Sequence, residues 1–228
     1  NGHLRQKGKI SELALGYGGS IGALQAMGSR EMNIPDEELK PLVDGWRKAN
    51  PRIVQFWRSV GDAAMKAVRE RTTVRAGKVT FCCKDGVLFA KLPSGRTLAY
   101  IAPRLETGRF GSTVITYQSY DKTEKAADEE EEAPVTRRWQ REETYGPKIV
   151  ENLTQAIARD LLCAAMMNLE AAGYRICMHI HDEAVIEMPI GQGSLEEACR
   201  LMAIAPDWAE GLPLRADGED DLSFYRKT

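Results

Sequence analysis

The sequence predicts an α+β fold, in which helices come first, a small antiparallel β-region follows, and a long helix with a β-hairpin ends the chain. Three observations predict it. Apolar residues recur at helical spacing from Leu4 to Arg71, short alternating runs begin at Lys78, and helical spacing returns after Pro147. With 228 residues, 43% of them hydrophobic, the chain can bury a core in one or two domains.

Three helices are predicted in the first part. The first lies within Leu4–Ala26 and is expected to break at Gly18-Gly19. The second spans Asp36–Ala49, because Asn50-Pro51 ends it, and the third spans Arg52–Arg71. The third carries an apolar stripe typical of a helix that packs on a core.

The middle of the chain predicts a small antiparallel β-element followed by an acidic loop. The expected strands are Val79–Cys82, Val87–Ala90, Thr97–Ile101 and Thr113–Tyr117. Residues 121–134 contain five consecutive carboxylates, which cannot be buried together, so this segment is expected to be a loop that divides the chain.

The second part predicts one long helix, Pro147–Ala172, and a hairpin of two strands, Arg175–His181 and Ala184–Met188. Ser194 is expected to cap a last short helix.

Composition excludes several classes of protein. No apolar run approaches the roughly 20 residues of a membrane span, and the first residues do not resemble a signal peptide, so a cytoplasmic protein without a membrane partner is expected. The five cysteines contain no C-x-x-C pair, which argues against a disulfide framework and a zinc ribbon.

Charge is unevenly distributed although the net charge is only -2. The segment Lys40–Arg75 has nine basic and three acidic residues, which favours contact with phosphates. The segment Asp182–Asp221 has eleven carboxylates and two arginines, which favours cations instead.

Two adjacent carboxylates, Asp182 and Glu183, are expected at the tip of the hairpin. A tight turn holds both with little freedom, and carboxylate oxygens are the ligands that magnesium prefers. A second interpretation uses the histidines. If Ile176 and Met178 pack inward, alternation places His179 and His181 together on the other face, where they could form a hydrolase-type metal cluster with Asp182.

A second polar group lies near the start of the chain. Arg5 and Lys9 are four residues apart, which places them on one face of a helix. Two cations in this arrangement suit a chain of phosphates, and Tyr17 offers an aromatic surface for a base.

Arg5, Lys9, Tyr17 and Gly18 have the spacing of motif B, the nucleotide-binding helix of family A DNA polymerases (the polymerase I type). His181-Asp182-Glu183 resembles motif C of the same family, and the order of the two motifs also matches.

Other segments extend the resemblance. Gln155 lies in a helix similar to the one that reads the minor groove of the primer–template, and Trp46–Trp57 and Leu92–Arg96 resemble the phage-encoded branch. The chain differs from the family pattern at Leu13, where many members have Phe or Tyr, and at Glu151, where the pattern has Asn. Motif A, which supplies another metal-binding aspartate, is not found in these residues.

The resemblance implies a helical fingers-like subdomain over residues 1–143, including the β-element and the acidic loop, and the C-terminal part of a palm over residues 144–228. It implies template-directed DNA synthesis by nucleotidyl transfer, with two Mg²⁺ ions in the complete site. Primer–template DNA and deoxynucleoside triphosphates are the implied substrates. An upstream polymerase segment or chain carrying motif A is an expected partner, without which this chain is expected to be inactive.

The resemblance also implies roles for single residues. Asp182, Glu183 and Lys9 are the expected catalytic residues, of which Asp182 and Glu183 bind metal. Arg5, Lys9, Leu13 and Tyr17 are expected to bind the incoming nucleotide. The residues expected to contact DNA are Tyr17, Gly18, Gln155 and His181.

Two alternatives stay open. A non-catalytic nucleic-acid-binding module would explain Lys40–Arg75 but not the pair Asp182-Glu183. A metal-dependent hydrolase would use His179, His181 and Asp182, but it leaves the cations near the start of the chain without a role.

Overall fold

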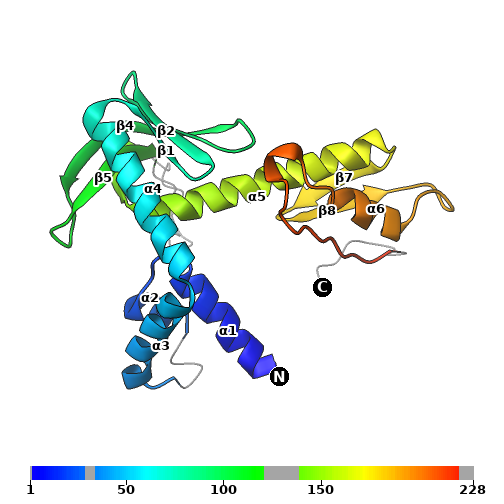
Figure 1. The fold of residues 1–228 in the computed structure, drawn as a ribbon. Helices are drawn as coiled ribbons and strands as arrows, with labels where there is room; N and C mark the ends of the chain where they lie inside the picture. Colours follow the sequence, from blue (N-terminus) through cyan, green and yellow to red (C-terminus); the bar gives the residue numbers. More distant parts are fainter. Residues whose placement is uncertain (1, 29–33, 121–138, 221–228) are drawn as a thin grey trace, which may run out of the picture. The chain divides into compact units, whose positions relative to one another are not determined.

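A computed structural model describes residues 2–28, 34–120 and 139–220 of the chain. Within them the fold is α+β, as the sequence predicts, with six α-helices, a six-stranded antiparallel sheet and a separate β-hairpin (Figure 1). The chain divides into two compact units: residues 1–92 with 96–153, and residues 93–95 with 154–228. The predicted acidic loop, 121–134, lies outside the described residues.

The first unit begins with four helices: α1 (Gly2–Leu15), α2 (Ile21–Ala26), α3 (Asp36–Ala49) and α4 (Pro51–Glu70). The predicted bounds of α3 are confirmed, and those of α4 differ by one residue at each end. The predicted break after the first helix is also confirmed, but the helix ends at Leu15, so that Tyr17 and Gly18 lie in the turn that follows it.

The sheet of the first unit is larger than predicted. Its strands are β1 (Thr73–Ala76), β2 (Val79–Lys84), β3 (Val87–Lys91), β4 (Thr97–Thr107), β5 (Thr113–Tyr120) and β6 (Trp139–Thr144). Each strand pairs antiparallel with the next along the chain, so β1 and β6 are the two edges. Neither edge strand is predicted from the sequence, because both are short or rich in polar residues, a common property of strands at a sheet edge.

One face of this sheet is buried and packs against α4, which crosses it in Figure 1. The side chains on the buried face include Val79, Phe81, Cys83, Leu88, Ala90, Tyr100 and Ile115. Trp57 of α4 stacks on Trp46 of α3, with ring centroids 5.8 Å apart, and this contact joins the two helices.

The second unit contains most of the long helix α5 (Gly146–Ala171), which begins in the first unit. Its other elements are the strands β7 (Arg175–Ile180) and β8 (Glu183–Glu187), the helix α6 (Leu195–Met202) and a single 3-10 turn, Asp207–Ala209. Leu169, Tyr174 and Ala198 form the buried centre of this unit, and apolar side chains of the hairpin and α6 pack around them.

Two sequence-based exclusions can be compared with the structure. None of the described helices is both long and apolar enough to cross a membrane. All five cysteines are free thiols.

Candidate functional site

The two predicted cations of the first helix, Arg5 and Lys9, lie on the solvent side of α1. Arg5 and Lys9 are exposed, and Leu13, one further turn along the helix, is 50% exposed. The opposite side of the helix is buried through Ala14 and Leu15. Because these side chains follow one another at four-residue steps, α1 presents one continuous stripe of two cations and an apolar residue.

The turn after α1 is held in place by close packing. Gly18 has a φ of +83°, and a Cβ added there would lie 2.5 Å from Cβ of Pro147 at the start of α5. Only glycine allows this approach. Tyr17, the neighbour of Gly18, therefore lies in a turn whose backbone is fixed, and its side chain is half-buried.

Two further contacts join this region to α3. The indole N–H of Trp46 donates to Glu12 Oε1 at 3.0 Å, and Arg47 donates to the carbonyl of Gly19 at 3.2 Å. The C-terminal end of α1 and the turn behind it are thus bonded to a second helix of the same unit.

The predicted carboxylate pair lies at the tip of the hairpin in the second unit. Ile180 pairs with Glu183, so His181 and Asp182 form the two-residue turn and Glu183 is the first residue of β8. The predicted turn at Asp182-Glu183 is therefore wrong by one residue. His181 has a φ of +54°, which residues other than glycine adopt only rarely. Asp182 is exposed and Glu183 is half-buried.

The prediction that His179 and His181 share a face opposite Ile176 is also wrong. Ile176 pairs with Ile186 but Met178 pairs with Val185, so the register shifts by one residue at Cys177. A β-bulge of this kind exchanges the faces on which the following side chains lie. Met178, predicted to point inward, is 47% exposed.

After the bulge, His179 pairs with Ala184, which packs against the buried centre of the second unit. His179 therefore lies on the helix side of the hairpin. There the guanidinium of Arg159 on α5 approaches it, with a guanidinium nitrogen 3.2 Å from each ring nitrogen. Sequence reasoning missed Arg159, although its position four residues after Gln155 places the two on one face of α5.

The donor set at the hairpin tip suits magnesium but not a histidine-rich metal site. Among the described residues, no three His, Cys, Asp or Glu side chains form a group that could hold a metal ion. The structure therefore does not support the cluster of His179, His181 and Asp182. Asp182 and Glu183 do provide the one or two carboxylates that proteins commonly offer to Mg²⁺ beside substrate phosphates.

Helix α5 carries the other predicted residue of the second unit. Gln155 is exposed on this helix. Five residues further along the same helix, Asp160 accepts a hydrogen bond from the hydroxyl of Ser94. This bond joins the turn between β3 and β4 to α5.

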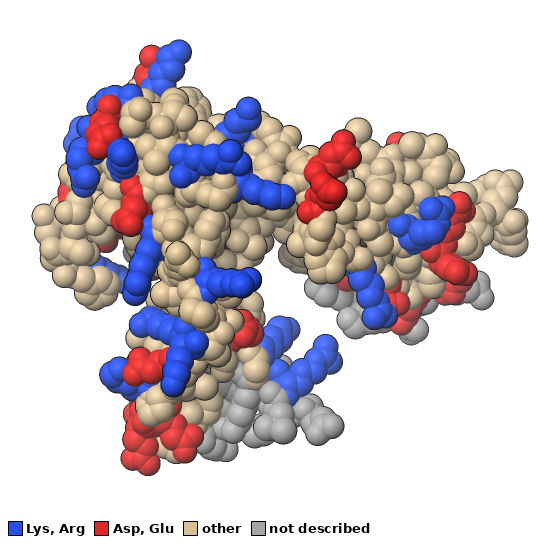
Figure 2. All heavy atoms as spheres, in the orientation of Figure 1, with Lys and Arg blue, Asp and Glu red and all other residues tan. Residues whose placement is uncertain are grey.

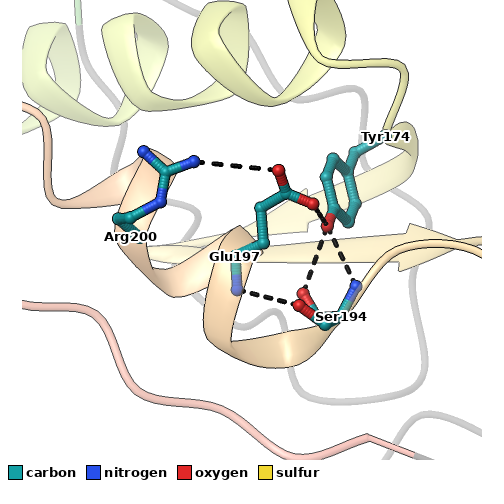
Figure 3. Close-up of polar contacts among 4 residues, drawn as sticks. All are labelled: Tyr174, Ser194, Glu197 and Arg200. Atoms are coloured by element: carbon teal, nitrogen blue, oxygen red, sulfur yellow. Dashed lines mark hydrogen bonds and ion pairs between the residues drawn. The ribbon is translucent and has the colours of Figure 1, made fainter.

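The start of the hairpin is fixed by Tyr174, whose side chain is 4% exposed (Figure 3). Its hydroxyl accepts from the backbone N–H of Ser194 at 3.0 Å and lies 2.7 Å from Glu197 Oε2. Ser194 caps α6, as predicted, by accepting from the N–H of Glu197 at 3.1 Å. In an ordinary capping box, Glu197 would reach the N–H of Ser194 itself, whereas here the tyrosine hydroxyl stands between them. We refer to Tyr174, Ser194 and Glu197 as the Tyr174 cluster.

The basic segment predicted to meet phosphates covers the outer side of α3 and α4. Its exposed residues on α4 are Arg52, Arg58, Lys66 and Arg69. In Figure 2, Lys and Arg side chains are spread over this part of the first unit, with Asp and Glu side chains between them.

The predicted site residues thus fall into two groups. Arg5, Lys9, Leu13, Tyr17 and Gly18 belong to the first unit, on α1 and the turn behind it. Gln155, His181, Asp182 and Glu183 belong to the second, on α5 and the hairpin.

Comparison with known proteins gives one informative match. The chain is 48% identical, over 226 residues, to a protein of Bacillus phage SP02 named DNA polymerase. The match covers 98% of this chain and 33% of the phage protein, so the chain spans a third of the length of that relative. No family model and no solved structure matches the chain. The chain is therefore homologous to one part of a phage DNA polymerase.

Proposed function

We propose that this chain forms part of a template-directed DNA polymerase of the family A type, in which α1 binds the incoming nucleotide and the β7–β8 turn supplies carboxylates to the catalytic centre. The observation that carries the proposal is the occurrence of both features in a chain that is 48% identical to part of a DNA polymerase. We assign residues 1–143 to the fingers and 144–228 to the palm.

The exposed stripe of α1 supports the nucleotide-binding role. The guanidinium of Arg5 would contact the outer phosphates of a deoxynucleoside triphosphate, because a planar cation pairs well with phosphate oxygens. Lys9, one turn along, would balance charge nearer the reacting phosphate and donate a proton to the departing pyrophosphate. Leu13 and Tyr17 would line the pocket for the sugar and base.

The hairpin turn supports the metal-binding role. Asp182 would bind Mg²⁺ directly, and Glu183 would contribute beside it. When bound, two Mg²⁺ ions stabilise the entering and leaving oxygens of an in-line displacement. The second ion requires a further aspartate, which we expect from an upstream segment with motif A. Gln155 and His181, together with Tyr17 and Gly18, would contact the primer–template.

The alternatives explain less. A nucleic-acid-binding module without activity gives no role to the turn that presents Asp182 and Glu183. A hydrolase built on His179 would need that imidazole as a ligand, whereas it lies on the helix side of the hairpin against Arg159.

The test of the metal role is Asp182→Asn, which keeps the size of the side chain and removes its charge. Primer extension by the chain supplied with an upstream motif A segment should fall at least about 100-fold, because loss of a metal ligand costs several kcal/mol in the transition state. Duplex binding should persist. Glu187→Gln, an exposed carboxylate of the same hairpin, is the matched control and should retain extension. Near-normal extension by Asp182→Asn would refute the assignment, and robust extension by the unsupplemented chain would refute the need for a further aspartate.

The test of the nucleotide role is Lys9→Ala and Arg5→Ala. Each removes a charge-assisted contact worth about 1.5–3 kcal/mol, so nucleotide use should fall roughly 10- to 150-fold. Arg215→Ala removes an exposed charge outside the assigned sites and serves as the control. If Lys9→Ala or Arg5→Ala weakened duplex affinity and left nucleotide kinetics unchanged, α1 would bind the DNA backbone instead.

A further inference from the structure

Among the described residues, the two faces of the six-stranded sheet of the first unit differ in exposure. Strand pairing places Cys82, Phe89 and Ala99 in one row across β2, β3 and β4, on the face opposite Phe81 and Leu88. Phe81 and Leu88 are fully buried, whereas Phe89 and Cys82 are half-buried and Ala99 is exposed. The more exposed face is therefore the one turned away from α4, although Val114 and Thr116 of β5 are buried on it, and we call it the open face.

Aromatic and apolar side chains lie on the open face. Tyr120 and Trp139 are direct cross-strand partners on β5 and β6, with ring centroids 5.4 Å apart at an angle of 73°. Tyr120 is 41% exposed and Trp139 is 57% exposed. Ile101, on the same face, is 39% exposed. More than half of the surface of Trp139 is accessible, so packing within the described residues does not account for a large aromatic side chain at this position.

Among the paired strand residues, basic side chains outnumber acidic ones on the open face. Strand pairing places on it five basic residues, Arg75, Lys84, Lys91, Arg104 and Arg141, and two acidic residues, Glu106 and Glu143. Arg141 is held within the sheet, because it donates to Thr116 and to the carbonyl of Ala102. Lys91 and Arg104 have exposed side chains that can reach a ligand.

We propose that the open face binds a single strand of nucleic acid, with bases stacked on Trp139 and Tyr120 and phosphates paired with Lys91 and Arg104. Aromatic rings beside cations on an exposed sheet suit this ligand, since every base has a flat face and every nucleotide carries a negative charge. The excess of positive charge favours this occupant over a protein segment of mixed charge. The inference rests on the proposed function only for the choice of DNA as the strand.

The first experiment measures binding of a fluorescent 12-residue oligothymidylate by anisotropy, in EDTA and without nucleotide, so that neither the metal site nor α1 with its triphosphate is needed. Trp139→Ala should weaken binding about 5- to 150-fold. The double variant Lys91→Ala with Arg104→Ala should lower the slope of log affinity against log salt by about 1.4, as expected for two lost phosphate contacts. The matched control removes two exposed charges from the second unit, Arg175→Ala with Arg215→Ala, and should leave the slope unchanged. A further variant, Arg58→Ala with Lys66→Ala, tests whether the basic segment on α4 binds the strand instead.

The second experiment tests stacking without removing the ring. The oligonucleotide should quench part of the tryptophan fluorescence of the wild-type chain, because Trp139 is the most exposed of the four tryptophans. Trp46 and Trp57 are buried, and Trp208, in the second unit, is half-buried. In Trp139→Phe this quenching should disappear while anisotropy still reports binding within about threefold, since phenylalanine also stacks.

Three results would overturn the proposal: no binding by the wild-type chain, unchanged quenching in Trp139→Phe, or a lower salt slope in the α4 variant but not in the open-face double variant. A lower slope in the α4 variant alone would mean that the strand binds to α4. No binding by the wild-type chain would mean that the open face binds a protein partner instead of nucleic acid. These results are independent of primer extension, so the proposal can fail while the polymerase assignment holds, and the reverse.

Discussion

Replacing Tyr174 by Phe removes one oxygen atom and tests whether the Tyr174 cluster fixes the start of the hairpin. The hydroxyl carries a single proton, which is expected to go to the carboxylate of Glu197 at 2.7 Å rather than to the carbonyl of Ser194 at 3.2 Å, because bonds to charged acceptors are stronger. The same oxygen accepts from the N–H of Ser194. The substitution therefore breaks two hydrogen bonds and leaves the aromatic ring in place.

The expected cost follows from the exposure of the partners. A hydrogen bond to a charged group contributes about 1.5–3 kcal/mol. Ser194 and Glu197 are exposed, so water replaces part of what is lost, and we expect a decrease of about 1–2 kcal/mol in the free energy of unfolding. For a chain of this size, the midpoint of thermal unfolding should fall by roughly 2–8 °C.

The assay combines urea unfolding with hydrogen exchange followed by mass spectrometry. Exchange should accelerate in peptides covering Arg175–Glu187 and remain unchanged in α4, because the lost bonds belong to the second unit. Tyr145→Phe, at a tyrosine that is 47% exposed, is the control and should change stability by less than about 0.5 kcal/mol. A double-mutant cycle with Glu197→Gln should show coupling. Full additivity, or a Tyr174→Phe effect no larger than the control, would refute this account of the cluster.

Two further predictions concern the first unit. Gly18→Ala should lower the free energy of unfolding by about 2–4 kcal/mol in urea titrations, because the added Cβ meets Pro147 and the positive φ disfavours alanine. The control is Gly22→Ala in α2, where a Cβ has no neighbour within 4 Å, and it should instead add about 0.5–1 kcal/mol. Equal effects at both positions would contradict the packing argument. Burial, followed by the nearby Glu142 carboxylate, raises the pKa of Tyr117 from 10.0 to about 12, so the unfolded chain releases this proton first, and the stability present below pH 10 should be lost as pH rises toward 12. Tyr117→Phe should flatten that alkaline decline in unfolding experiments, and an unchanged profile would show that other groups cause it.

The elements that the sequence predicts well are those with strong local signals. Helix α3 matches its predicted bounds because Asn50-Pro51 stops it, and Ser194 caps α6 as expected. The edge strands were missed for a physical reason. β6 contains Glu142 and Glu143 and is stabilised by pairing with β5, a long-range interaction that the local pattern of apolar residues does not reveal.

The placement of the candidate residues was predictable only in part. Arg5 and Lys9 lie on one exposed face of α1, as expected, and the two carboxylates lie beside a hairpin turn, but that turn is His181-Asp182 and not Asp182-Glu183. The position of His179 was not predictable, because alternation assumes a regular strand and one extra residue reverses the assignment. Its neighbour Arg159 comes from another element, so no local pattern indicates their contact.

The bulge at Cys177 has a consequence for how sequence changes in the hairpin act. The extra residue changes which positions of β7 face the same side. Ile176 and His179, an even-numbered and an odd-numbered residue, lie on one side of the hairpin because Cys177 is not paired. Deleting Cys177 while keeping every other side chain would remove the bulge and leave the pairs Met178–Val185 and His179–Ala184 in regular alternation, with Met178 still outward and His179 still beside Arg159. Related chains should therefore tolerate both substitution and deletion of residue 177, because the pairs on either side of it stay in register without it.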